Sequence, residues 1–130
     1  MSMDYTTIQN EVIQKYNIKI ETDSKCWKRT HAHIDGSRRV CKWNQANSYA
    51  STFTLFHEIG HIETHKKSYK RYEQEYYATT WGTDKMKEAG LPIKRKKVQK
   101  YKDYIRRTYE RGIRRGLETT NTEIVRYLSA

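Results

Sequence analysis

The spacing of apolar residues in the first third of the chain changes from a helical to a strand period. Between residues 4 and 17, apolar side chains recur three or four residues apart, at Tyr5, Ile8, Val12 and Tyr16. This spacing predicts an amphipathic helix. Apolar and polar residues then alternate over 18–22, which predicts a short strand. Residues 26–43 hold the turn-forming pair Asp35–Gly36 between two apolar segments, so they predict a β-hairpin.

The middle of the chain returns to the helical period. Asn47 and Ser48 are suitable N-caps for a helix over 49–66. Its apolar stripe is formed by Leu55, Ile59 and Ile62. A further helix is predicted over 69–89, because Gly90 and Pro92 follow it and both commonly end helices.

The last third of the chain predicts two more helices. One apolar stripe runs through an otherwise cationic segment, at Val98, Tyr101, Ile105, Tyr109 and Ile113. Gly112 and Gly116 weaken the end of this basic helix. The sequence Thr-Asn-Thr-Glu at 120–123 resembles a capping box, which predicts a final short helix.

The length of 130 residues is that of one domain with one modest core. The N-terminus lacks the basic start and apolar run of a signal peptide, and no 18-residue apolar stretch occurs, so we expect a cytoplasmic protein. Cys26 and Cys41 are then expected to be structural thiols. A disulfide between them is one alternative, and metal ligation by both is another, although they form no CxxC pair.

Positive charge is concentrated near the C-terminus. Eleven Lys and Arg residues stand between 94 and 115 against Asp103 and Glu110, so this segment carries +9 of the net charge of +11. Such a segment, interleaved with tyrosines, favours contact with nucleic acid or with an acidic partner, and a merely solvated helix face is the alternative. The cations expected to make this contact are Lys94, Arg95, Lys96, Lys97, Lys100, Arg106, Arg107, Arg111, Arg114 and Arg115.

The helix predicted over 49–66 carries a metal-binding motif, His57-Glu58-Ile59-Gly60-His61. Two histidines four residues apart project from one helix face, where both imidazoles can bind one zinc ion. Glu58 lies beside the metal without being required as a ligand, so it can accept a proton from the attacking water. Coincidental histidines on an exposed helix are the alternative interpretation.

A catalytic zinc ion needs a third protein ligand, and three residues compete for this role. Glu75 is preferred, because Ala78, Thr79 and Gly82 form a small-residue face that allows its helix to approach the His57 helix. Glu73 is the first alternative, on nearly the opposite side of the same helix. His65 lies one further turn along from His61, so we expect it to be exposed or to face substrate.

Other polar residues are candidates for lining the site. His31 and His33 share one face of the predicted hairpin, where they line the cleft or are ordinary strand residues. Tyr72, Tyr76 and Tyr77 are close enough in sequence to Glu75 to assist at the oxyanion, and the sequence does not distinguish among them.

Two segments together resemble the ImmA/IrrE family of metallopeptidases. They are FTLFHEIGHI at 53–62 and EYYATTWG at 75–82. The family shows F-T-L-A-H-E-[LI]-G-H on one helix and E-x-x-A-[DN]-x-[FW]-A on the next. Thr79 stands here in place of the family's Asp or Asn and Gly82 in place of its final Ala, and the two motifs are closer together.

The resemblance covers about residues 30–90 and implies roles for individual residues. His57, His61 and Glu75 would bind Zn²⁺, and Glu58 would be the general base. It also implies an intracellular protease of phages or mobile elements, in a bacterial host cell, that cleaves helix-turn-helix repressors.

The sequence as a whole predicts a compact α+β, zincin-like domain. It would contain a small antiparallel sheet, the HExxH helix, a ligand-bearing helix and a basic C-terminal helical extension. Residues 1–92 would form the metallopeptidase domain, and residues 93–130 would belong to the same domain or pack on it. The expected function is zinc-dependent cleavage of a protein substrate. Alternatives are a non-catalytic DNA- or repressor-binding module with a structural or vestigial metal site, and a DNA-tethered protease of DNA-bound proteins.

Overall fold

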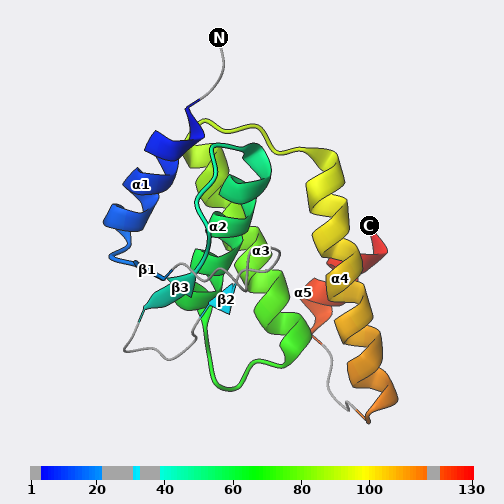
Figure 1. Ribbon diagram of the computed structural model, residues 1–130. Coiled ribbons are helices and arrows are strands. Elements are labelled where there is room, and N and C mark those ends of the chain that lie inside the picture. The colour runs from blue at the N-terminus through cyan, green and yellow to red at the C-terminus, as the bar shows by residue number, and fades with distance from the viewer. Residues whose placement is uncertain (1–3, 22–30, 33–38, 117–120) are drawn as a thin grey trace.

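Helices dominate the fold (Figure 1). The computed structural model describes residues 4–21, 31–32, 39–116 and 121–130. Within these ranges the elements are, in chain order, α1 (Tyr5–Lys15), β1 (Lys19–Glu21), β2 (His31–Ala32), β3 (Val40–Lys42), α2 (Tyr49–Thr64), α3 (Arg71–Glu88), α4 (Arg95–Arg114) and α5 (Thr122–Ser129). The α+β class and the order of helices and strands agree with the sequence prediction.

The small sheet is mixed, so the prediction of an antiparallel sheet is wrong for one of its two strand pairs. β2 and β3 pair antiparallel, as expected for a hairpin, and the Asp35–Gly36 turn lies outside the described residues. β1 instead pairs parallel with β3, with Ile20 opposite Cys41. The strand order is β1-β3-β2, so β3 is the central strand, with β1 along one edge and β2 along the other.

The helix ends follow the capping chemistry in the sequence. Ser48 accepts a hydrogen bond from Ser51 N at the start of α2, and Asp4 does the same for Thr7 N in α1. The last helix is capped by Asn121, whose side-chain oxygen accepts from the backbone N–H groups of Glu123 and Ile124. The predicted cap, Thr120, lies outside the described residues.

Two apolar clusters lie on opposite sides of α3. The larger one joins α1, the sheet and α2, and it includes Cys41, Leu55 and Ile59, all fully buried. The smaller one joins α3, α4 and α5 around Tyr72, Tyr76, Ile105 and Ile124. Tyr101 of α4 packs against the larger cluster, so α4 contacts both. The basic helix is therefore part of the packed structure.

Cys41 is a buried free thiol at the centre of the sheet. Burial, with a smaller contribution from the charge of Glu58, raises the pKa of this thiol far above its usual value. Cys41 is thus an apolar packing residue, as predicted, while Cys26 lies outside the described residues. No helix in the described ranges is both long and apolar enough to cross a membrane.

Helices α2 and α3 cross at unusually short range. A Cβ atom at Gly60 would overlap the carbonyl oxygen of Ala78 and lie 3.0 Å from its Cα. A Cβ atom at Gly82 would lie 3.2 Å from the backbone N of His57 and from the backbone carbonyl of Phe56. The small-residue face predicted for α3 therefore does bring the two helices together.

We expect Gly60→Ala to lower the free energy of unfolding by about 1–3 kcal/mol, because the added methyl group meets backbone that cannot rotate away. Gly82→Ala should lower the free energy of unfolding by less, since a Cβ atom at Gly82 would lie farther from its nearest neighbours than one at Gly60. Both changes can be measured by urea denaturation followed by circular dichroism. Alanine's higher helix propensity alone would predict that Gly60→Ala leaves the free energy of unfolding unchanged or raises it. That result would contradict the close approach of α2 and α3 at Gly60.

Candidate metal centre

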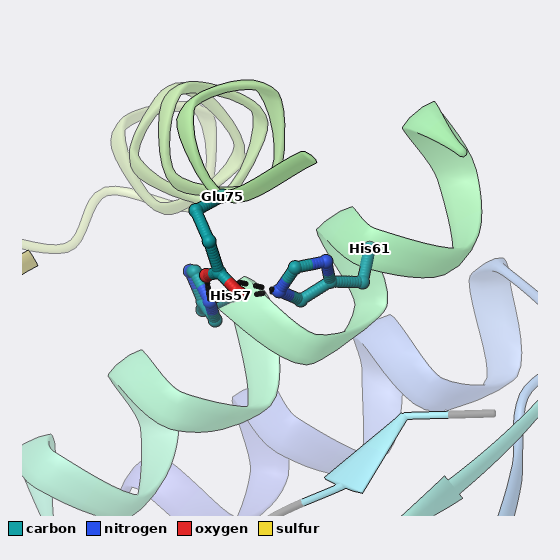
Figure 2. A group of neighbouring side chains, drawn as sticks. All are labelled: His57, His61 and Glu75. Carbon is teal, nitrogen blue, oxygen red and sulfur yellow. Dashed lines mark hydrogen bonds and ion pairs between the residues drawn. The ribbon is translucent and has the colours of Figure 1, made fainter. Parts of the chain in front are cut away.

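Helix α2 presents two buried histidines to α3. His57 and His61 are 4% and 7% exposed, and they lie one turn apart on the helix face that α3 covers. Glu75 of α3 is 4% exposed and points back between the two imidazoles (Figure 2). Three ionisable side chains are thus brought together in an interior where each would be costly alone.

The three donor atoms form a nearly equilateral triangle. His57 Nε2 and His61 Nε2 are 3.1 Å apart, and each lies 3.2 Å from Oε2 of Glu75. Ligand atoms at about 2.0–2.1 Å from a tetrahedral zinc ion are themselves about 3.3 Å apart. The triangle therefore has the size of one face of a zinc coordination tetrahedron. Two nitrogens and one carboxylate oxygen are also donors that zinc accepts, so these residues could bind a metal ion.

The electrostatics of the site favour a cation. Burial acts to raise the pKa of Glu75, but the hydrogen bonds and charges of His57 and His61 outweigh it and hold the pKa well below its usual value. Burial lowers the pKa of His57. Burial also acts to lower the pKa of His61, but Glu75, together with the charge of Glu58, raises it overall. Glu75 is therefore stabilised in its charged form, and a carboxylate in this position favours a cation beside it.

Thr79 fixes the orientation of His57. Its hydroxyl donates to the backbone oxygen of Glu75 at 2.8 Å and lies 3.2 Å from Nδ1 of His57. Because its single proton is already donated, the hydroxyl is placed to accept from Nδ1–H, in the tautomer that would present the Nε2 lone pair to a metal ion. Thr79 is the position at which the chain departs from the ImmA/IrrE pattern of Asp or Asn. A hydroxyl oxygen performs here the same orienting task as a carboxylate or amide oxygen.

Glu58 follows His57 directly on α2. It is partly exposed, unlike the three buried donors. Its charge acts on His61 of α2, Arg71 of α3 and Tyr101 of α4, so its carboxylate is close to all three elements around the site. The residue predicted as general base is therefore partly accessible to solvent, and its charge reaches His61, one of the three donors.

Tyr101 is a residue of the site that the sequence did not indicate. Its ring packs on the imidazole of His57, with centroids 4.4 Å apart, and stacks on Phe53 at 5.2 Å. Burial is the main cause that raises the pKa of Tyr101 to about 12. The negative charges of Glu58 and Glu75 raise this pKa further, and a hydrogen bond with Thr54 lowers it in part. The sequence showed only a tyrosine in an apolar stripe, since nothing local reveals that its ring lies on His57 of α2.

The three tyrosines considered as candidates to assist at the oxyanion have partners in α5 and just before it. The Tyr72 hydroxyl accepts from Asn121 N, and Tyr77 bonds Asn121 and Glu123. Tyr76 packs against Tyr127. All three take part in the packing of α3 against α4 and α5.

The alternative ligands are not at the triangle. Glu73 accepts from Lys70 N and from the side chain of Asn121, so it caps α3 and anchors α5. His65 is the C-cap of α2 and is half-buried, with Nδ1 lacking a hydrogen-bond partner among the described residues. His31 belongs to β2, while His33 lies outside the described residues. The geometry thus selects Glu75 among the three candidates.

The predicted basic contact residues have different environments on α4. Arg106 donates to the backbone oxygen of Leu128 at 2.8 Å and to Asp103 at 3.2 Å, so it fastens α5. Lys97 is half-buried, and burial lowers its pKa. The remaining eight are exposed: Lys94, Arg95, Lys96, Lys100, Arg107, Arg111, Arg114 and Arg115. Tyrosines of this segment were predicted to stack on nucleic-acid bases. The ring of Tyr101 cannot do so in this structure, because it packs against His57 and Phe53.

Comparisons of the chain with protein-family models, with curated proteins and with solved structures found no match. The resemblance to the ImmA/IrrE family therefore remains a prediction from the two motifs. The geometry of His57, His61, Glu75 and their neighbours is the feature of this chain that bears on function.

We expect Thr79→Val to weaken zinc affinity by about 10–100-fold, because valine keeps the volume but cannot accept from His57 Nδ1–H. Thr83→Val is the matched control, since its hydroxyl bonds only backbone oxygens of Thr79 and Thr80 within α3. Competition against a chromophoric chelator measures both affinities. Equal affinity for zinc in the two variants would show that Thr79 does not orient the ligand.

Proposed function

We propose that this protein hydrolyses peptide bonds with a zinc ion bound by His57, His61 and Glu75. The observation that carries the proposal is the buried triangle of donor atoms with edges of 3.1–3.2 Å, next to a partly exposed glutamate on the same helix. A purely structural zinc site is normally closed by four protein ligands. Among the described residues, only three groups form this cluster, which suits a catalytic site.

Zinc at this position would supply a Lewis acid that activates water and polarises the carbonyl of the scissile bond. The chain's own residues supply the rest. Glu58 accepts a proton from the attacking water as the new C–O bond forms, and it returns a proton to the amide nitrogen as the C–N bond breaks. Tyr101 and Thr79 hold the His57 ring from two sides, so the imidazole cannot turn away from the site.

The zincin-like character of the domain belongs to this proposal. Two histidines one turn apart on α2, a base next to the first, and a third ligand on the following helix are the features that support it. The resemblance of segments 53–62 and 75–82 to the ImmA/IrrE family adds a protein substrate, with a DNA-binding repressor as the most specific form of the proposal. The exposed cations of α4 are available to hold an acidic partner or DNA.

Metal content and activity together test the proposal. We expect about one zinc per chain by inductively coupled plasma mass spectrometry, retained in Glu58→Gln and strongly reduced in His57→Ala and Glu75→Ala. Glu58→Gln should lower the hydrolysis of a casein substrate by at least 100-fold, because it removes the general base while keeping the fold and the ion.

Glu73→Gln is the control for Glu75→Ala, since Glu73 lies two residues away and caps the helix. It should keep the full zinc content. Zinc retained in Glu58→Gln with no loss of cellular function would instead favour the non-catalytic binding module. Cleavage that requires added DNA would favour a DNA-tethered protease. A protein that binds no zinc, even when zinc is offered, would refute the proposal.

A further inference from the structure

A hollow of about 360 Å³ lies between the first turn of α3 and the last turn of α4. Its eight lining residues are Lys70, Arg71, Tyr72, Thr108, Arg111, Gly112, Arg115 and Gly116. Tyr72 and Thr108 are buried at its base. Thr108, Gly112 and Gly116 follow one another four residues apart, and the two glycines leave that stripe of the chain without side chains. At Gly112 and Gly116 the hollow is therefore lined by backbone and not by side chains.

Four of the eight lining residues are cations. Lys70 and Arg71 come from α3, and Arg111 and Arg115 from α4, and all four are exposed. Among the residues that the structure describes, only Arg71 of these four forms an ion pair, with Glu75. Like charges that converge from two elements on one hollow repel one another unless an anion lies between them.

Stability alone does not account for this arrangement. Lys70 and Arg71 stand at the N-terminus of α3, where the helix dipole is positive and disfavours cations. Gly112 lies within the last turns of α4, where glycine is a poor helix former. Both features lower stability locally, and both add to the space and the positive potential of the same hollow. They indicate a binding role.

The hollow adjoins the metal centre through Arg71. The guanidinium Nε of Arg71 lies 3.5 Å from Glu75 Oε1, and its Nη2 lies 3.3 Å from the hydroxyl of Tyr104. Arg71 is thus shared between the wall of the hollow and the surroundings of the ligand carboxylate. An extended polypeptide advances about 3.3 Å per residue. A group bound in the hollow would therefore belong to a residue a few positions in sequence from a bond held at the metal.

We infer that this hollow binds the carboxylate of an aspartate or glutamate side chain of the polypeptide substrate, near the bond that is cut. The inference rests on the proposed peptidase function and adds a substrate preference to it. Guanidinium groups pair with a carboxylate through two parallel hydrogen bonds, and three of the four cations are arginines. A nucleic acid strand presents phosphates at regular intervals and is bound along an extended groove. A single concave site with converging cations suits one anionic group instead.

The test uses the zinc-loaded full chain and a peptide mixture of random sequence, with the cut sites read by mass spectrometry. We expect Asp and Glu to be enriched at one position a few residues from the cut. For a peptide chosen from this set, replacing that Glu by Gln should lower kcat/KM about tenfold. In Arg111→Gln/Arg115→Gln the ratio between the two peptides should fall to near one.

Arg95→Gln/Arg114→Gln is the matched control, because it removes the same charge from exposed positions of the same helix that do not line the hollow. It should keep the tenfold ratio. Efficient cleavage without any acidic preference would overturn the inference and leave the proposed function standing. An equal loss of the ratio in both double variants would also overturn it, since net charge alone would then be responsible.

A direct binding measurement separates failure of the inference from failure of the proposed function. If no peptide is cut, fluorescence anisotropy with a labelled Glu-rich peptide and with a labelled DNA duplex is measured on the same variants. Peptide binding weakened about tenfold by Arg111→Gln/Arg115→Gln, but not by the control, would support the hollow as a carboxylate site. Loss of DNA binding without loss of peptide binding would assign the hollow to nucleic acid and overturn the inference.

Discussion

The close contact between α2 and α3 at Gly60 and Ala78 determines the rest of the site. Only at this separation can a glutamate on α3 reach two imidazoles on α2 and place its oxygen 3.2 Å from both. The same contact brings the short side chain of Thr79 to the back of His57. A longer residue at 60, 78 or 82 would move α3 outward and open the triangle of ligand atoms.

The sequence predicted what is encoded locally. The spacing of His57 and His61, the helix ends and the small-residue face of α3 each depend on a few neighbouring residues, and they led to Glu75 as the third ligand. Strand direction was wrong for β1, because alternation tells which face of a strand is buried and says nothing about its neighbour.

Tertiary packing accounts for the parts of the site that the sequence did not show. Tyr72, Tyr76 and Tyr77 were placed near the metal because they are close to Glu75 in sequence, yet they turn toward α5. Tyr101 is 26 or more residues from every metal-binding candidate, and its ring lies on His57. Sequence distance is a poor guide to a site formed between helices, because each helix presents different faces to different neighbours.

The contact of Tyr101 with His57 also bears on the order in which the site is completed during synthesis. Chains emerge from the ribosome N-terminus first, so both histidines and Glu75 are synthesised before α4. The ring that covers His57, and the Tyr49 hydroxyl that bonds Pro92 O and Lys94 N ahead of α4, are completed only afterwards. A nascent chain that ends before α4 would therefore carry the three donor residues without the ring that covers His57.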